Sequence, residues 1–247
     1  MKRGVRRGFW LRILYQIARG RRGWMIMKNL RINEQPGTQR AHGFSLLEMT
    51  MVLALVIVVA SIGFMSLQPS LRAQRVTNGY NTTLSALRMA RDNAVSQRTS
   101  YHLQFIKTTT SSTITVSPTL STFQGAQRTV TYALPFEIAF SAEAGIPTSN
   151  PPDGFGSGLT AIDFGYTPQG TGSGGAADLY FCPDGSVQDA TNGAGNCAGN
   201  WNSGVVYIAR PGELLSSRAI TVWGGTGRIR GWRLYNTGSG GAAWKRQ

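Results

Sequence analysis

The residue with the clearest chemical potential is a carboxylate in an apolar setting. Glu48 lies near the start of the chain's only long apolar run, residues 44–65, and is the one charged residue within it. These 22 residues would measure about 33 Å as a helix, enough to cross the hydrocarbon core of a bilayer. A carboxylate inside such a segment is costly, which makes it a functional-site hypothesis by default. What Glu48 pairs with therefore bears directly on function.

Three interpretations of this segment compete. A secretory signal peptide has an apolar stretch of about 7–15 residues followed by a small-residue cleavage site; this run is longer, has no convincing site of that kind, and contains Glu48. A plain membrane anchor explains the length and the basic flank but not Glu48. A cut between Gly43 and Phe44 would instead keep the span and place Glu48 one helical turn from a new N-terminus. Glu48 could then neutralise the free amine of a neighbouring helix, where an unpaired charge is expensive.

Gly43, Phe44 and Glu48 together resemble the type IV prepilin and type II secretion pseudopilin signal, which has Gly before the cut, Phe after it and Glu at the fifth mature position. The resemblance implies cleavage and N-methylation of Phe44 by a prepilin peptidase. It also implies packing with other pilins or pseudopilins, helix against helix, in a filament. A leader of 43 residues is long for this class, and Met25 or Met27 offers an internal start that would shorten it.

The net charge of +14 suggests a nucleic-acid binder, but its distribution does not. Residues 1–43 hold eleven of the 25 basic residues and one of the 11 acidic ones, so they carry +10 and the remainder +4. Basic residues beside a span keep that side in the cytoplasm. Together with the prepilin resemblance, this implies a single-pass protein of the bacterial inner membrane. Its C-terminal domain would lie in the periplasm and later in a pilus or pseudopilus.

Two cysteines, Cys182 and Cys197, fall in the part expected outside the membrane, where disulfides persist. The 14 residues between them are polar and rich in turn-forming types, as in a loop that a crosslink would hold. A metal site would need further ligands, and the only histidines, His42 and His102, are distant in sequence. A disulfide is therefore favoured over a metal site.

The elements that position these residues indicate an α+β fold, with one long N-terminal helix at residues 44–98 and a β domain at residues 99–247. Residues 44–65 would be the membrane anchor or filament core, and Gly63 and Pro69 predict a kink or partial melt after it. Beyond them one helix face is apolar, comprising Val76, Tyr80, Leu84, Leu87, Ala94 and Val95. Arg88, Arg91 and Arg98 are interpreted as a solvated face of the same helix.

In residues 99–247, short segments place apolar residues at every second position, and turn-forming residues separate these segments. Apolar alternation predicts strands around 101–105, 114–116, 130–132, 136–140, 162–166, 179–181, 205–209, 219–223 and 229–235. The stretches 141–160, 167–177 and 184–204 are rich in Gly, Ser, Pro and Asn and predict exposed loops. These strands and loops predict an antiparallel sheet or a two-sheet sandwich packed on the helix.

Motifs for catalysis are absent from the sequence. Residues 170–175 satisfy G-x-G-x-x-G but lead toward a strand rather than a helix, so the dinucleotide interpretation fails. His102 has no nucleophile motif beside it and is expected to be a surface residue of a strand. We therefore expect no enzyme, no cofactor and no metal.

The closing strands carry the second distinctive pattern. Residues 204–210 and 218–233 resemble the last strands of the GspH/FimT family of minor pseudopilins and minor pilins, with Gly227, Arg228 and Arg230 matching a G-R-x-R motif. The family implies a β-sandwich-like head on a long N-terminal helix, near a filament tip. In its FimT branch the motif is implicated in DNA binding.

An extended strand would place Arg228 and Arg230 about 6.6 Å apart on one face, a spacing that suits neighbouring phosphates. Trp232 shares that face and could stack on a base, while Arg233 points to the other. The alternative is that these are ordinary outward residues of a final hairpin. Two hypotheses thus stay open: a structural subunit for pilus or pseudopilus assembly, and a minor pilin that binds DNA for natural transformation.

Overall fold

The structure is a computed structural model that describes residues 43–108, 111–120, 129–166, 178–192, 195–238 and 240–247. The expected leader, both internal methionine starts, the loop 167–177 and its glycine motif lie outside the described residues, apart from Gly43. By its internal contacts the chain divides into two units, residues 1–52 and 53–247.

Helix α1 (Leu46–Gln97) is a single unbroken element. It ends where Arg98 adopts a left-handed φ of 54°. The partial melting predicted at Gly63 and Pro69 is absent, since Pro69 lies within the helix. Proline removes only one backbone hydrogen bond and its own φ is already helical, so the turns on either side propagate through it. The Ser66 hydroxyl also donates to the Gly63 carbonyl at 2.9 Å.

The buried face of α1 begins at Val76 and recurs at alternating spacings of four and three. It comprises Val76, Tyr80, Thr83, Leu87, Ala90 and Ala94, with Gly79 and Ala86 beside them. Four of the six predicted positions are buried, Leu84 is half-buried, and the prediction for Val95 was wrong because it is 46% exposed. Small residues take up much of this face: a Cβ on Gly79 would lie 2.9 Å from Cγ2 of Ile138.

Two antiparallel sheets make up the β domain. The first has the order β3 (Val130–Ala133), β2 (Ser112–Pro118), β1 (Tyr101–Lys107), β6 (Asp178–Phe181) and β7 (Val187–Gln188). The second has the order β11 (Ala242–Arg246), β10 (Arg228–Asn236), β9 (Arg218–Trp223), β8 (Ser203–Ala209) and β4 (Ala139–Phe140), and β5 (Ile162–Tyr166) also pairs with β8.

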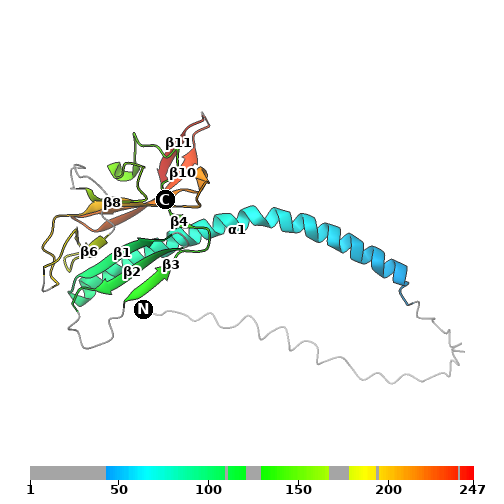
Figure 1. The fold of residues 1–247 in the computed structure, drawn as a ribbon, viewed down its shortest axis with the longest axis horizontal. Coiled ribbons are helices and arrows are strands. Elements are labelled where there is room, and N and C mark those ends of the chain that lie inside the picture. The colour runs from blue at the N-terminus through cyan, green and yellow to red at the C-terminus, as the bar shows by residue number, and fades with distance from the viewer. Residues whose placement is uncertain (1–42, 109–110, 121–128, 167–177, 193–194, 239) are drawn as a thin grey trace, which may run out of the picture. The chain divides into compact units, whose positions relative to one another are not determined.

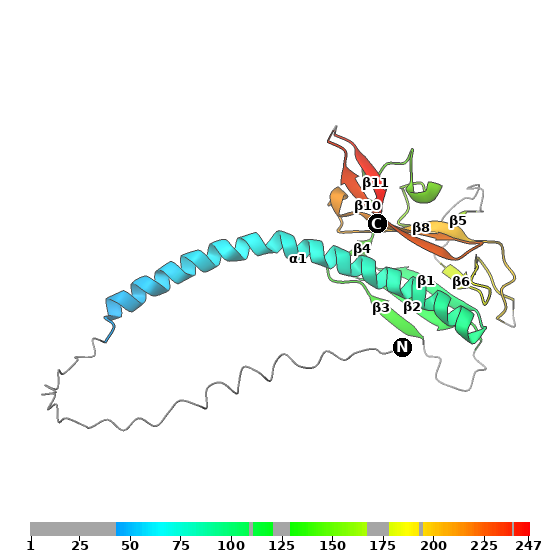
Figure 2. The same ribbon diagram turned by 180° about the vertical axis from the view of Figure 1, so that it is seen from behind.

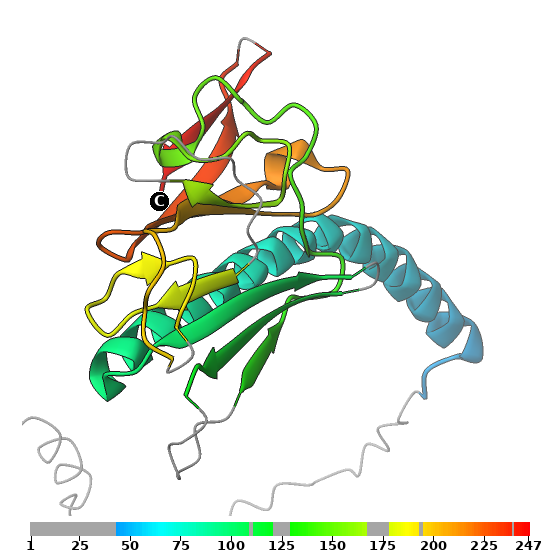
Figure 3. The same ribbon diagram turned by 60° about the vertical axis from the view of Figure 1, so that its left-hand side comes forward.

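The main core lies between α1 and both sheets. It contains Leu87 of α1, Leu103 of β1, Phe181 of β6 and Ile220 of β9, all fully buried. Figures 1 and 2, which view the molecule from opposite sides, both show α1 running along β1 and β2. Figure 3 separates the green first-sheet strands from the orange and red strands of the second. The predicted α+β fold, with a long apolar helix packed with antiparallel sheets, is confirmed.

A smaller core lies on the other face of the second sheet, where Phe155 and Ile146 cover Tyr207 and Leu234. The loop 141–160, which also contains the short 3-10 helix η1 (Pro152–Gly154), was predicted to be exposed. Instead it forms part of this core, because its few apolar side chains are buried against the sheet.

Two further expectations about strands need correction. The strand expected at 136–140 is reduced to β4, since Glu137 takes a φ of 69° in a turn from Pro135 and leaves Phe136 80% exposed. Strands β7 and β11 were not predicted, and β7 lies within the stretch 184–204 that was expected to be an exposed loop. Both are short, and neither shows a clear apolar alternation.

Candidate functional site

The expected processing junction lies just before α1. Gly43 and Phe44 are exposed, with Phe44 at 77%, and a side chain built on Gly43 would meet no atom within 4 Å. The backbone on either side of the Gly43–Phe44 bond is therefore open in this structure.

Glu48 occupies the first turn of α1 and is exposed. Among the residues that the structure describes, no cation lies within ion-pair distance of its carboxylate. The unsatisfied N–H groups at the start of a helix favour a negative charge there by about 0.3–1 kcal/mol. In an apolar medium that small gain would leave most of the cost of the charge uncompensated.

None of the described residues packs over the apolar half of α1. An 18-residue window within it has a mean hydropathy of 2.5 and no buried residue, so α1 is long and apolar enough to cross a membrane by length and composition. Side chains such as Leu53, Ile57 and Phe64 are each more than half exposed. Soluble monomers rarely expose an apolar surface of this extent. The segment is therefore compatible with a single membrane span.

The G-R-x-R motif begins at the last residue of the turn between β9 and β10 and continues into β10. The Gly227 amide donates to the Trp223 carbonyl at 2.7 Å with a φ of 57°, and Arg228 starts β10 as an exposed residue. Arg228, Arg230 and Trp232 share one face of β10, as the sequence predicted for a strand, but their surroundings differ.

Arg230 is held inside the fold. Its Nη1 pairs with Oδ1 of Asp153 in η1, and the exposed fractions of the two side chains are 20% and 6%. Its guanidinium also lies 5.7 Å from the centre of the Trp223 ring. The second oxygen of Asp153 accepts from Thr221, which in turn accepts from the Trp232 indole at 3.3 Å. Arg230 and Trp232 thus belong to a hydrogen-bonded chain that fastens loop 141–160 to the second sheet.

Arg228 meets a different set of groups. A cavity of about 280 Å³ is lined by Arg228, the turn residues before it and Arg88, Arg91 and Asp92 of α1. Arg91 is half-buried there, its Nη2 donating to the Thr226 carbonyl at 3.3 Å, so the expectation of a fully solvated face was wrong for this residue. Arg88 and Arg98 are exposed as expected. Three cations from two distant parts of the chain therefore border one cavity.

Cys182 and Cys197 form a disulfide with their Cα atoms 5.9 Å apart. The bond joins the end of the first sheet to the polar segment that follows β7. In the chain-entropy model a crosslink closing about 15 residues contributes roughly 3 kcal/mol to stability. The disulfide is therefore a large local contribution in a segment with few apolar residues.

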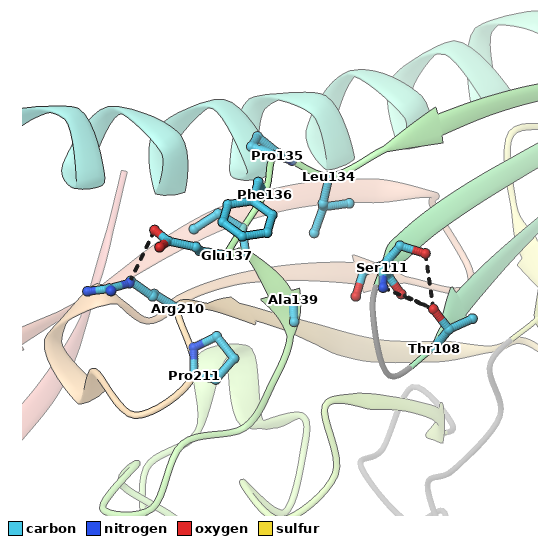
Figure 4. A pocket seen from close by; sticks show the side chains of 11 residues that line it. Thr108, Ser111, Leu134, Pro135, Phe136, Glu137, Ala139, Arg210 and Pro211 are labelled. Carbon is cyan, nitrogen blue, oxygen red and sulfur yellow. Dashed lines mark hydrogen bonds and ion pairs between the residues drawn. The ribbon is translucent and has the colours of Figure 1, made fainter.

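A cavity of about 510 Å³ lies between the β1–β2 hairpin and the turn before β4 (Figure 4). Its one carboxylate, Glu137, is paired with Arg75 at 3.0 Å and faces Arg210 at 3.7 Å. The hydroxyls of Thr108 and Ser111 bond to each other at 3.0 Å. These polar groups serve to fasten the turn to α1 and to close the hairpin.

Two polar clusters were not anticipated from sequence. The carboxylate of Asp163, 2% exposed, accepts hydrogen bonds from Ser157 Oγ and Tyr166 Oη, both at 3.1 Å. Burial and this carboxylate raise the pKa of Tyr166 to about 12. His102 is half-buried rather than a free surface residue, stacked on Tyr180 with its Nε2 3.1 Å from Asp178. No sequence motif marked either cluster, because their members come together only in the folded sheets.

No protein-family model matches this chain, and neither the curated proteins nor the solved structures compared with it gave a match. Among the described residues, no three His, Cys, Asp or Glu side chains lie together in a metal-binding group. The features that bear on function are therefore the exposed apolar helix, the carboxylate at its start and the arginines of the head.

Proposed function

We propose that this chain is a minor pseudopilin or minor pilin. Cleaved between Gly43 and Phe44 and N-methylated at Phe44, it would insert through α1 into a type II secretion pseudopilus or type IV pilus, with an initiating or tip role. The observation that carries the proposal is the apolar half of α1, which none of the described residues covers, with Glu48 at its start unpaired among those residues, joined to a folded α+β head. The resemblance of Gly43, Phe44 and Glu48 to the prepilin signal supports it.

The proposal gives each part of the chain a role before and after assembly. The basic leader would keep the N-terminus in the cytoplasm, and residues 44–65 would cross the inner membrane. The head would then lie in the periplasm, a compartment in which the Cys182–Cys197 bond persists. Leader removal by the prepilin peptidase would release α1 to join a bundle of similar helices.

Glu48 would supply the recognition within that bundle. In an environment of low dielectric constant, its carboxylate is strongly attracted to a positive charge and costly to leave alone. The methylated amine of a neighbouring mature N-terminus is such a charge, one helical turn away along the axis. Pairing between the two would fix the axial register of one subunit against the next.

A Glu48→Ala substitution tests this role in cells of the source bacterium. We expect normal cleavage, since the peptide bond after Gly43 is unchanged, but at least about tenfold less protein in sheared filaments, because breaking a buried pair costs about 3–5 kcal/mol. Mass spectrometry of the N-terminus measures cleavage and methylation, and immunoblotting measures incorporation. The control is Asp92→Ala, which removes an exposed carboxylate from the same helix. A mature N-terminus other than Phe44, or normal incorporation of Glu48→Ala, would refute the proposal.

A second candidate is DNA binding for natural transformation, as the FimT branch suggests. The observation in its favour is the convergence of Arg88, Arg91 and Arg228 on one cavity beside the Gly227 turn. Guanidinium groups so placed can contact successive phosphates, although three contacts give weak and salt-sensitive binding unless several subunits act together.

Gel-shift titration of the full chain in maltoside detergent tests this candidate. Arg228→Ala should weaken binding to duplex DNA and lower the slope of log K against log salt by about one. Arg246→Ala, which removes an exposed arginine outside this cavity, is the control. Equal binding by the wild type and the Arg228 variant at low salt would exclude this candidate.

A further inference from the structure

The arginine that opens β9 is buried without an acidic partner. Arg218 is 8% exposed and shares its strand face with Ile220 and Val222, which pack in the core beneath α1. In the part of the chain that the structure describes, no carboxylate lies within 4.0 Å of its guanidinium, and its side chain makes no hydrogen bond. A buried charge is normally paired, because its desolvation is otherwise uncompensated.

A second arginine on the sheet makes the burial of the Arg218 charge less favourable. Arg233 of β10 is the direct cross-strand partner of Arg218, and like charges in this position are destabilising. Burial and, to a smaller extent, Arg233 lower the pKa of Arg218. The Nε atom of Arg233 is itself buried without a hydrogen-bond partner among the described residues. Both guanidinium groups therefore present unused donors.

A cavity of about 220 Å³ opens in front of these two residues, between α1 and the segment leading into β9. Arg72 of α1 lines its wall, giving three arginines; we call this the three-arginine cavity. Among the described residues, Glu213 is the only acidic one that lines it, and its carboxylate accepts from Arg210 at 3.3 Å. The cavity is therefore suited to an anion.

The position of the cavity along α1 identifies the anion. No charged residue occurs between Glu48 and Arg72, so Arg72 is the first cation after the apolar run. It lies seven residues beyond Met65, about 10 Å along the helix axis. The headgroup layer on each side of a bilayer extends roughly 5–8 Å beyond the hydrocarbon core. When residues 44–65 span the core, the backbone of Arg72 lies just outside this layer, and its long side chain can reach back to the phosphates.

We propose that the three-arginine cavity, formed by Arg72, Arg218 and Arg233, binds the phosphate of a phospholipid headgroup in the membrane from which α1 emerges. The proposal rests on the membrane insertion that the proposed function includes. Guanidinium groups bind phosphate oxygens through paired, charge-assisted hydrogen bonds. The lipid phosphate would offset the repulsion between Arg218 and Arg233 and hold the head against the membrane surface until the subunit enters a filament.

Native mass spectrometry of the full chain, released from maltoside micelles, measures this binding directly. The probe is dioctanoyl-phosphatidylglycerol, titrated against wild type, Arg218→Gln and Arg233→Gln. Each variant should bind at least about tenfold more weakly, because each removes charge-assisted hydrogen bonds to the phosphate. The matched control is Arg98→Gln, which removes an exposed arginine from the far end of α1 and should bind like wild type. Should Arg218→Gln fail to fold, the more exposed Arg233→Gln carries the test.

Equal affinity in wild type and variants would overturn the proposal. Binding of inorganic phosphate as tight as that of the lipid would also overturn the proposal, because a membrane lipid would then not be the specific source of the phosphate. A third contrary result is that the arginine variants bind lipid normally but lose self-association, which would assign the cavity to an acidic side chain of a neighbouring subunit. Glu48→Ala should retain lipid binding. A variant that binds lipid normally but fails to enter filaments bears on the proposed function alone. A variant that loses lipid binding but still enters filaments bears on the lipid proposal alone, so the two proposals can be told apart.

Discussion

Replacing Arg230 by alanine is expected to destabilise the head by about 3–5 kcal/mol, the usual cost of removing one member of a buried ion pair. Asp153 is only 6% exposed at its side chain and would keep one neutral partner, the Thr221 hydroxyl. Loop 141–160 would lose its main polar attachment to the second sheet. Guanidinium unfolding of the full chain in maltoside, followed by tryptophan fluorescence, measures the loss, since Trp223 and Trp232 lie beside the pair.

Arg228→Ala is the matched control, because it changes the other arginine of the same motif at an exposed position and should stay within about 0.5 kcal/mol of wild type. A double variant, Arg230→Ala with Asp153→Ala, should recover part of the loss by removing the stranded carboxylate. Equal stability of the two single arginine variants would show that the Arg230–Asp153 pair contributes little. If the difference is found, loss of DNA binding in an Arg230 variant cannot be attributed to a lost DNA contact.

The long helix, the β domain and most strands were predictable because each has its own periodicity in the sequence. Val76, Tyr80 and Leu87 mark the buried helix face by size and spacing alone. Gly79 and Ala90 were missed for the opposite reason: small residues carry little apolar signal, yet Gly79 lets the helix approach Ile138 closely. The large apolar side chains of a helix therefore indicate which of its faces is buried. They say less about how closely that face packs against its neighbours.

The candidate sites also differ in how far the sequence alone could predict them. Gly43, Phe44 and Glu48 are contiguous with the apolar run, so their pattern can be recognised in the chain itself. The partner of Arg230 lies 77 residues away in a loop expected to be exposed, and no local pattern connects them. Arg218 appeared as one cation in an apolar strand, and only the register with Arg233 and the proximity of Arg72 reveal the cavity they share.

Changing Gly227 to alanine is expected to cost about 2–5 kcal/mol, the sum of a left-handed backbone penalty of about 1–2 and an overpacking penalty of about 1–3. Gly227 has a φ of 57°, and an added Cβ would collide with the Gly185 carbonyl oxygen and lie 2.9 Å from Nε of Arg91. The carbonyl belongs to the backbone, so it cannot move aside as a side chain would. Thermal unfolding of the full chain, followed by tryptophan fluorescence, measures the expected loss.

Gly212→Ala separates the two contributions, because Gly212 has a φ of 81° but nothing within 4 Å of an added Cβ. It should show the backbone penalty alone, about 1–2 kcal/mol. Similar losses in both variants would mean that the turn can shift away from Gly185. A larger loss at Gly227 would show that this glycine is required for close approach between the β9–β10 turn and the β6–β7 turn, beside Arg91. The glycine of the G-R-x-R motif would then be needed to bring Arg228 and Arg91 to one cavity, whichever partner that cavity binds.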